Sequence, residues 1–446
     1  MKIVIAGAGD MGTHLAKMLS GNGHDITVAD VDPKALGEVA NLIDVVTVEG
    51  DTTQFSVLRK AGVRKCDLFI AVRSVQNDNI LSAVMAKQLG AKKSIARVDS
   101  SEYLEPNSKE VFIDMGIDYI FYPEHIAARE VINLLGHTST TEYVDFAAGK
   151  LSLVAFRLEL TSPLLGRKVI DPEQNDEDIE YRTVAIVRGS RTIIPTSEEL
   201  FEEEDMVYII TRHNSTQKVV ELSGKREVEI KNMMILGGSR IGVRIANELQ
   251  NDINVKLVDY NADKAYRLAE MLDSTLIINE DGRNTEAMME EDLAGMDAFV
   301  AVTGRSETNI LAAMLAKRMG VKRVIAEVEN INYIQLAESI GVDTVINKKH
   351  ITASNIFRFT MTTDVQAIKC LTGSQAEVLE FIVKPNSPAT KSKVADLGLP
   401  SDAVIGGVVR GDRVFIAVDD TQINAYDHIV VFAMPESVTR VAEFFN

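Results

Sequence analysis

The feature that most constrains this sequence is an internal repeat at an offset of 230 residues. The stretch NILSAVMAKQLGAKKSIARV (79–98) matches NILAAMLAKRMGVKRVIAEV (309–328) at 11 of 20 positions without a gap. At the same offset, CDLFIAV is answered by MDAFVAV, and Asp51 by Asp281. Self-similarity at a fixed offset means that a structural unit is repeated. The repeat excludes a single catalytic domain with added decoration.

Each copy of the repeat alternates short β-branched runs with amphipathic helical patterns. This alternation is typical of a parallel, doubly wound, Rossmann-like sheet with right-handed crossovers. In the first copy it predicts strands at 2–6, 26–30, 45–48, 68–72, 94–98 and 119–121, and helices near 11–21, 33–42, 53–61, 77–89 and 101–115.

A second pattern follows each of these domains. Segments 151–212 and 378–434 contain short alternating strands separated by turn residues, which predict a small α+β domain. The polar stretch SGKREVEIKN (223–232) is the expected linker, and SEELFEEED (197–205) is expected to be a solvated charged loop. We therefore predict four domains. Two large nucleotide-binding domains cover 1–136 and 232–357, and each is followed by a small domain, at 137–222 and 366–446.

The charge and hydropathy of the sequence argue against a nucleic-acid-binding protein and against a membrane-spanning one. A net charge of −18 argues against nucleic-acid binding, which needs basic surface. No apolar run approaches the roughly 20 residues of a membrane span, and a first strand at Lys2 is not expected to leave room for a targeting segment. Two cysteines, Cys66 and Cys370, make no disulfide framework. We expect a cytoplasmic protein, and its acidity permits docking on the basic cytoplasmic loops of a membrane protein.

The N-terminal stretch KIVIAGAGDMG predicts a dinucleotide-binding loop. Gly7 is expected to make the tight turn, Gly9 to let the backbone approach the phosphates, and Gly12 to let the helix pack on the first strand. Asp30 ends the second strand, 18 residues past Gly12, where a carboxylate bonds ribose hydroxyls. Because a carboxylate repels a 2′-phosphate, Asp30 favours NAD(H) or an adenine nucleotide over NADP(H).

Further binding residues are expected around the loop and at the ends of later strands, where doubly wound sheets form their ligand crevice. Arg73 and Arg97 are candidates to neutralise phosphate charge, with a surface salt bridge as the alternative for each. The full predicted first site comprises Gly7, Ala8, Gly9, Asp10, Met11, Gly12, Asp30, Asp51, Thr52, Arg73, Ser74 and Arg97.

The second loop, LGGSRIG, differs from the first in two ways. Ser239 adds a side chain where the backbone should approach phosphate, and Arg240 replaces the acid that the first loop has at Asp10. The predicted second site comprises Gly237, Gly238, Ser239, Arg240, Ile241, Gly242, Asp259 and Asp281. We infer that the two sites bind different ligands or that the second binds weakly; an empty, degenerate second site is the alternative.

The sequence offers no recognisable catalytic group. A dehydrogenase needs a proton donor or acceptor beside the reacting carbon. None of the seven histidines lies in a His/Asp or Tyr/Lys arrangement with telling spacing, and the small domains are short for a substrate domain. Catalysis is therefore unsupported, although an NAD-dependent oxidoreductase on a doubled Rossmann scaffold remains the main alternative.

The domain order, together with GAGDMG, VEGDTT (48–53), AVRSVQNDNI (71–80) and VIGGVVRG (404–411), resembles the TrkA family over essentially the whole chain. These are the tandem RCK regulatory subunits of Trk-type potassium uptake systems. The resemblance implies a non-enzymatic homotetramer on the inner face of the membrane, beneath a TrkH-type potassium-translocating subunit. It also implies binding of NAD(H) and of ATP or ADP, whose effects pass to the channel as lobe movements.

The same resemblance implies a role for Glu124 in the stretch YPEH, which matches an acid that helps bind a cation between lobes in related regulators. The second half has Lys349 at this place, so such a role is confined to the first half. A redox or energy sensor with a different, non-channel partner is a third possibility for the chain.

Overall fold

The structure is a computed structural model of the 446-residue chain. It describes residues 1–21, 23–169, 180–189, 191–196, 198–225, 227–330, 333–360, 365–371, 374 and 376–445. Ser197 of the expected charged loop and the side chain of Cys370 lie outside the described part. The chain forms two compact units, the first from 1–127 and 348–362 and the second from 128–347 and 363–446.

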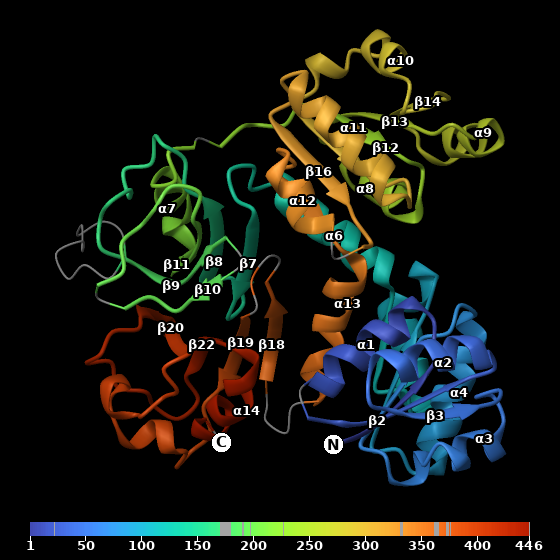
Figure 1. The fold of residues 1–446 in the computed structure, drawn as a ribbon, viewed down its shortest axis with the longest axis vertical. Helices are drawn as coiled ribbons and strands as arrows, with labels where there is room; N and C mark the ends of the chain where they lie inside the picture. The colour runs from blue at the N-terminus through green and yellow to red at the C-terminus, as the bar shows by residue number, and fades with distance from the viewer. Residues whose placement is uncertain are drawn as a thin grey trace. The chain divides into compact units, whose positions relative to one another are not determined.

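The first unit contains a six-stranded parallel sheet in the order β3-β2-β1-β4-β5-β6 (Figure 1). The sequence predicted a parallel, doubly wound sheet, and this strand order is typical of that fold. Its strands are β1 (Lys2–Ala6), β2 (Asp25–Asp30), β3 (Val46–Glu49), β4 (Leu68–Ala71), β5 (Lys93–Arg97) and β6 (Tyr119–Phe121). Its helices are α1 (Asp10–Gly21), α2 (Pro33–Leu42), α3 (Phe55–Lys60), α4 (Gln76–Leu89) and α5 (Pro106–Asp114). α13 (Lys348–Phe357), which is distant in sequence, also belongs to this unit and packs against α1. α6 (Pro123–Leu135) begins in the first unit.

One predicted helix of the first unit is wrong. The sequence pattern indicates a continuous helix over 101–115, but a short 3-10 turn ends at Leu104 and α5 starts at Pro106. Between them Glu105 is extended, with φ −63° and ψ 146°. Proline disfavours the helical conformation of the residue before it and donates no backbone hydrogen bond, so it begins a helix instead of continuing one.

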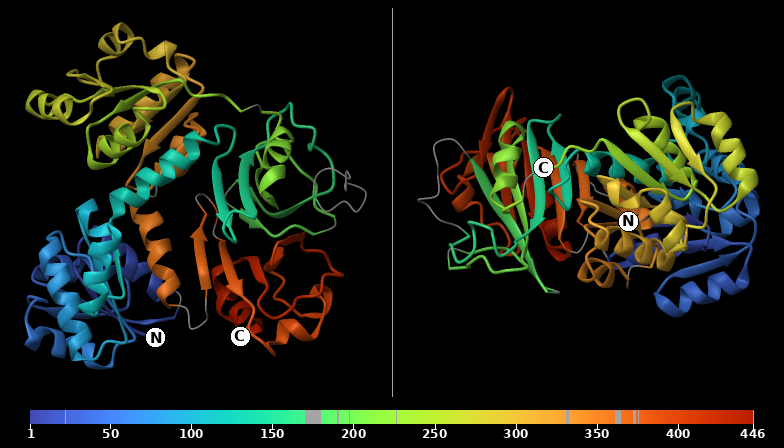
Figure 2. Two further views of the ribbon diagram at one scale, coloured as in Figure 1. Left: turned by 180° about the vertical axis from the view of Figure 1, so that it is seen from behind. Right: turned by 90° about the horizontal axis from the view of Figure 1, so that it is seen from above.

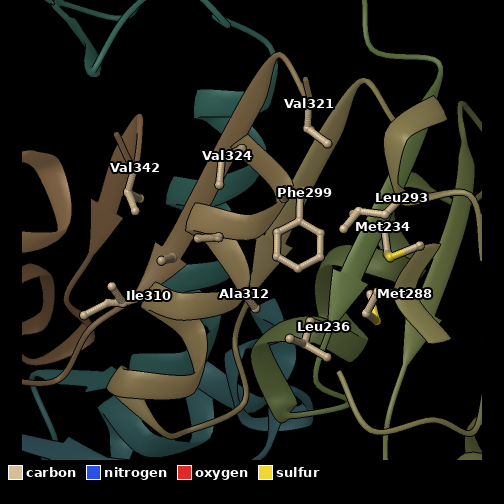
Figure 3. Packing of buried hydrophobic residues seen from close by; sticks show 14 of the residues in the cluster. Met234, Leu236, Met288, Leu293, Phe299, Ile310, Ala312, Val321, Val324 and Val342 are labelled. Carbon is tan, nitrogen blue, oxygen red and sulfur yellow. The ribbon is translucent and has the colours of Figure 1, made fainter. Parts of the chain in front are cut away.

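The second unit repeats the parallel sheet in the order β14-β13-β12-β15-β16-β17. Its strands are β12 (Asn232–Leu236), β13 (Asn254–Val258), β14 (Thr275–Ile278), β15 (Ala298–Ala301), β16 (Arg323–Glu327) and β17 (Thr344–Ile346). Its covering helices are α8 (Arg240–Leu249), α9 (Ala262–Met271), α10 (Thr285–Glu290), α11 (Ser306–Arg318) and α12 (Ile334–Ser339). Figure 3 shows the ring of Phe299 among side chains of neighbouring strands and helices, in a core that fixes the sheet beneath the second loop.

The second unit also contains two small antiparallel sheets with the same strand order. One runs β10-β9-β11-β8-β7 and the other β21-β20-β22-β19-β18. They share one buried core and lie against each other (Figure 2). The first comprises β7 (Glu142–Phe146), β8 (Leu151–Arg157), β9 (Tyr181–Arg188), β10 (Arg191–Ile193) and β11 (Met206–Arg212), with α7 (Thr216–Glu221). The second comprises β18 (Val365–Cys370), β19 (Glu377–Ile382), β20 (Ala403–Arg410), β21 (Arg413–Ile416) and β22 (His428–Ala433), with α14 (Pro435–Phe444).

A buried ion pair occurs at the same place in both small sheets. Arg188 donates through Nε and Nη2 to the two carboxylate oxygens of Asp205, each at 2.8 Å, and Asp205 is fully buried. Arg410 holds Asp427 in the same way at 2.9 and 2.7 Å. Part of the stretch 197–205, expected to be solvated, is therefore anchored, because a bidentate guanidinium compensates the burial of its last carboxylate.

No helix in the described ranges is long and apolar enough to cross a membrane.

Candidate nucleotide sites

The first loop joins β1 to α1 through a turn that leaves space at one glycine only. Gly7 has a φ of +124°, and its N–H donates to Ala29 O at 2.9 Å. A Cβ on Gly12 would lie 1.9 Å from Gly7 O, so the helix packs directly on the turn. A Cβ on Gly9 would meet nothing within 4 Å. Packing therefore explains Gly12, whereas the open space at Gly9 fits the approach of a pyrophosphate to the backbone.

Asp30 stands beside this loop at the end of β2. Its Oδ2 accepts from Ala8 N at 2.7 Å, and its Oδ1 accepts from Asp32 N at 3.0 Å. A carboxylate has about four acceptor positions, so two more are available to hydroxyl donors. No cation of the described residues pairs with Asp30, which suits it to the hydroxyls of a ribose.

Arg73 lies between two acids at the end of β4. Its Nη1 is 2.9 Å from Asp51 Oδ1 and 3.2 Å from Asp78 Oδ2. A backbone hydrogen bond from Thr53 and the Arg73 charge lower the pKa of Asp51. The salt bridge anticipated for this arginine is thus present, and its contact with phosphate stays a prediction.

Buried polar side chains hold these strand ends together. Asn79 is 1% exposed and bonds the backbone of both Arg73 and Arg97, so it ties β4 to β5. Thr52 is fully buried, with its Oγ1 3.2 Å from Ser82 Oγ, whereas Ser74 is exposed. The sequence did not single out Asn79, although its repetition as Asn309 inside the matched stretch was a usable signal.

Arg97, at the end of β5, and Glu124, at the start of α6, lie near each other. Arg97 Nη2 is 3.1 Å from Asp99 Oδ1 and 4.0 Å from Glu124 Oε1. Glu124 therefore has a cationic neighbour already. In the described part of the chain, three or more His, Cys, Asp or Glu side chains do not gather as a metal site. The cation role of Glu124 stays a prediction.

A residue from the second half of the chain reaches the first loop. Lys349, on α13, donates from Nζ to Asp10 Oδ2 at 2.7 Å. Asp10 begins α1, and its side chain is 79% exposed. The sequence set Lys349 against Glu124 by register only and did not predict this contact. The contact neutralises the acid at the end of the helix that faces the expected phosphates.

The second loop keeps the turn of the first. Gly237 has a φ of +110°, and a Cβ on Gly242 would lie 2.1 Å from Gly237 O. Ser239 caps α8, because its Oγ accepts from Gly242 N at 3.3 Å. The serine thus has a local structural role in addition to lining the site. Ile241 is buried and Arg240 is exposed on the first turn of α8.

The acid of the second site is engaged by a lysine. Asp259 accepts from Gly238 N at 2.8 Å and from Asn261 N at 3.0 Å, as Asp30 does from its own loop. In addition, Lys264 Nζ donates to Asp259 Oδ2 at 2.8 Å. Burial alone would raise the pKa of Asp259, but the hydrogen bonds from Lys264 and the backbone lower it overall. The two sites thus differ in the charge offered to a ribose.

A cavity of about 280 Å³ lies over this second loop. Arg283 holds Asp281 at its rim, with Nη2 2.6 Å from Oδ2. This hydrogen bond lowers the pKa of Asp281 to about 2. The described residues lining the cavity include Gly237, Ser239, Asp259, Tyr260, Lys264, Asp281, Arg283, Thr303 and Arg305. Three cationic and two acidic side chains among them give the cavity a small local excess of positive charge.

Both halves of the chain match known domain families. The TrkA-N domain family matches residues 3–123 and 233–348, and the TrkA-C domain family matches 153–224 and 378–446. The Trk system potassium uptake protein TrkA of Halomonas elongata is 31% identical over 447 residues, covering 99% of this chain and 98% of the relative. The Trk system potassium uptake protein TrkA homolog of Archaeoglobus fulgidus is 31% identical over 448 residues and is covered completely, as is this chain.

Solved structures share the fold at low sequence identity. The GsuK channel bound to NAD aligns with 99% of this chain and 78% of its own, with a TM-score of 0.62 and 17% identity. The GsuK RCK domain aligns with 99% of this chain and 94% of its own, with a TM-score of 0.63 and 16% identity. A further structure shows GsuK bound to ADP, with a TM-score of 0.51 and 15% identity over 80% of this chain and 68% of its own. These likenesses confirm the predicted tandem architecture.

Proposed function

The chain belongs to the TrkA family of potassium-uptake proteins, and from this premise we propose that it is a non-enzymatic, nucleotide-sensing regulatory subunit. In this proposal the first loop binds NAD(H), the second binds ATP or ADP, and their occupancy controls potassium movement through a TrkH-type membrane subunit. The relatives are named as potassium-uptake proteins, and the channel GsuK has been solved with NAD and with ADP.

The main support for the proposal is that the acids of the two sites, Asp30 and Asp259, have different hydrogen-bond partners. Asp30 has only backbone donors, whereas Asp259 also has the ammonium of Lys264 at 2.8 Å. Two sites of one design but of different charge are suited to two different nucleotides. A doubled catalytic domain would repeat its reacting groups, whereas the position of Lys264 is occupied by Ala35 in the first half.

Regulation requires that each ligand prefers one arrangement of the protein over another. The Lys349–Asp10 contact supports such coupling, because a helix of the second half touches the loop that is proposed to bind the first nucleotide. A phosphate at this loop attracts Lys349 and competes with Asp10 for it. Binding at the first loop therefore changes the forces on α13.

The assembly and the boundaries of the domains are part of the same proposal. We place the nucleotide-binding domains at 1–136 and 232–357, and the small domains at 137–222 and 366–446. The working form is a homotetramer, peripheral to the inner face of the cell membrane. Its net charge of −18 favours contact with basic loops of the membrane subunit.

Potassium uptake tests the proposal directly. The full chain is co-expressed with a TrkH-type subunit in cells that lack their own potassium uptake, and growth is measured at low potassium. Rescue by the wild type and its loss with Asp30→Ala support a nucleotide-dependent regulator. Equal growth with and without the chain contradicts it, as does equal rescue by both proteins.

An NAD-dependent oxidoreductase is the alternative that the nucleotide loop itself favours. Incubation of the protein with NADH and a panel of carbonyl substrates distinguishes the two functions. Steady consumption of the reduced nicotinamide would contradict the regulatory proposal. A sensor with a non-channel partner predicts instead that no potassium transporter co-purifies from membranes in mild detergent.

A further inference from the structure

A second polar cavity in the second unit lies away from the nucleotide loop of that unit. Its volume is about 430 Å³. It is formed by the segment after α6, by β8, and by the residues around the start of β16 and the end of α12. The nucleotide loops use the carboxyl ends of the strands. This cavity is at the opposite edge of the parallel sheet, where β16 begins at Arg323.

The cavity is basic although the chain is strongly acidic. Its described lining includes five cationic side chains and three acidic ones, namely Arg157, Lys225, Lys317, Lys322 and Arg323 with Glu159, Glu338 and Asp343. Burial raises the pKa of Glu338 and so favours its uncharged form. In a chain of net charge −18, such a local excess of positive charge indicates a site for an anion.

Arg323 is the buried cation of this cavity. Its side chain is 3% exposed, and its Nε has no hydrogen-bond partner among the described residues. Nη2 donates only to the Leu134 carbonyl oxygen, at a long 3.4 Å. Burial lowers the pKa of the guanidinium to about 10, against the opposing effect of the Asp343 charge. A buried charge without close compensation destabilises a fold unless a ligand completes it.

The acids of the cavity are already engaged by other cations. Asp343 accepts from Lys317 Nζ at 2.6 Å and from Val324 N at 2.8 Å. Glu159 lies 3.1 Å from Lys225 Nζ. Neither carboxylate makes a direct pair with Arg323 in the described part of the chain. Among the described residues of this lining, the guanidinium is therefore the one cation whose donors still require an acceptor.

Hydroxyl groups complete the set of donors. Thr138, Ser139, Thr140 and Thr141 line the cavity in succession. Thr138 and Thr140 donate to backbone carbonyl oxygens. Ser139, which is 7% exposed, and Thr141 bring two further hydroxyls. Guanidinium, ammonium and hydroxyl donors around one space match the oxygens of a phosphate group.

The first half of the chain does not repeat this arrangement. Lys93 stands at the position equivalent to Arg323, but it is exposed, and its Nζ lies 5.9 Å from the centroid of the Phe359 ring. The buried guanidinium is thus particular to the second half and is not required by the strand register. Lys93 provides a matched control position.

We propose that this cavity binds a small phosphate-bearing polyanion, with Arg323 as the buried anchor. The described lining of this site includes no residue of either nucleotide loop, and the site gives the chain a third ligand input. The oxygens of the ligand take the unused donors of Arg323, and Ser139 and Thr141 orient it.

Calorimetric titration of inorganic pyrophosphate into the full chain, saturated with NADH, tests this site. We expect binding by the wild type and by Lys93→Met, and binding about tenfold weaker or worse for Arg323→Met, because charge-assisted hydrogen bonds are lost. Equal binding by Arg323→Met and the wild type would overturn the proposal, as would no binding by the wild type.

Thermal unfolding separates a lost site from a lost fold. Replacing a buried, poorly compensated charge by an apolar side chain is often neutral or stabilising. We expect Arg323→Met to melt no lower than the wild type without ligand. Pyrophosphate should raise the melting temperature of the wild type and of Lys93→Met, but not that of Arg323→Met. If Arg323→Met melts lower, Ser139→Ala replaces it, and undiminished pyrophosphate binding by Ser139→Ala then counts against the site.

Discussion

Lys264 Nζ lies 2.8 Å from Asp259 Oδ2, whereas Asp30, the equivalent acid of the first half, receives only backbone N–H groups. One lysine therefore distinguishes two loops that share the same backbone turn. The first half has Ala35 at the position of Lys264, and its neighbour Lys34 is turned to solvent, 4.0 Å from Glu38.

Removing the ammonium should make the second acid available to a ribose. With Lys264→Met, we expect the affinity of the second site for NADH to rise about threefold to tenfold, because Asp259 regains acceptor capacity worth about 1 kcal/mol. Calorimetry in an Asp30→Ala background isolates this site. Lys34→Met, which removes an exposed lysine near the first acid, is the control and should change nothing. Weaker NADH binding by Lys264→Met would show that the lysine is itself a ligand contact.

Gly9 separates folding from binding in the first loop. Because a Cβ there would meet no atom within 4 Å, Gly9→Ala should leave the melting temperature almost unchanged and weaken NADH binding by about tenfold or more. Gly12→Ala, whose Cβ would lie 1.9 Å from Gly7 O, should instead lower the melting temperature. Unchanged NADH binding by Gly9→Ala would mean that the pyrophosphate does not lie on this turn.

The Lys349–Asp10 pair should affect binding more than stability. Lys349→Gln leaves the Asp10 carboxylate uncompensated near the phosphates, so NADH affinity should fall by a few fold. Asp10→Asn in the same chain should restore it. Because Asp10 is largely exposed, the melting temperature should shift little. Fluorescence titration of NADH with the two single variants and the double variant measures the coupling. If the two substitutions had additive effects on NADH affinity, this coupling between Lys349 and Asp10 would be excluded.

His14 makes the contact between α1 and α13 sensitive to acid. Burial, followed by the charges of His350, Lys349 and Lys17, lowers the pKa of His14 from 6.5 to about 4. The folded state therefore holds His14 neutral where the unfolded chain would protonate it. This contribution to stability is present above pH 6.5 and is lost as the pH falls toward 4. His14→Gln should flatten the fall in melting temperature over this interval, and an unchanged slope would contradict the assignment.

The sequence predicted the sheets better than the contacts around the sites. Local periodicity and the repeat were sufficient for the parallel sheets, because each strand–helix unit carries its own pattern. The short strands β7 and β18 were missed, since their pairing depends on neighbours distant in the sequence. The break before α5 was missed although Pro106 signals it.

The site residues likewise divide into those of a local sequence motif, which could be predicted, and those brought to the site by other contacts, which could not. The glycines and Asp30 belong to one local motif and could be predicted from it. Lys264 is close in sequence to Asp259, yet its contact depends on the side-chain conformation, which the sequence does not fix, and the first half has Ala35 at this position. Lys349 reaches Asp10 across 339 residues, and Arg323 is buried by the end of α6. Such long-range contacts leave no periodic signal in a single sequence.

The central claim is that the two halves hold nucleotides at non-equivalent sites. Calorimetric titration of NADH, NAD, ATP and ADP into the wild type, Asp30→Ala and Asp259→Ala tests it most directly. We predict that Asp30→Ala removes the tight NADH transition of the first site, leaving only weak NADH binding at the second, and keeps the ATP or ADP transition. Asp259→Ala should remove the ATP or ADP transition and keep the tight NADH transition. Equal loss of all four ligands in both variants, or NADH binding untouched by Asp30→Ala, would contradict the account.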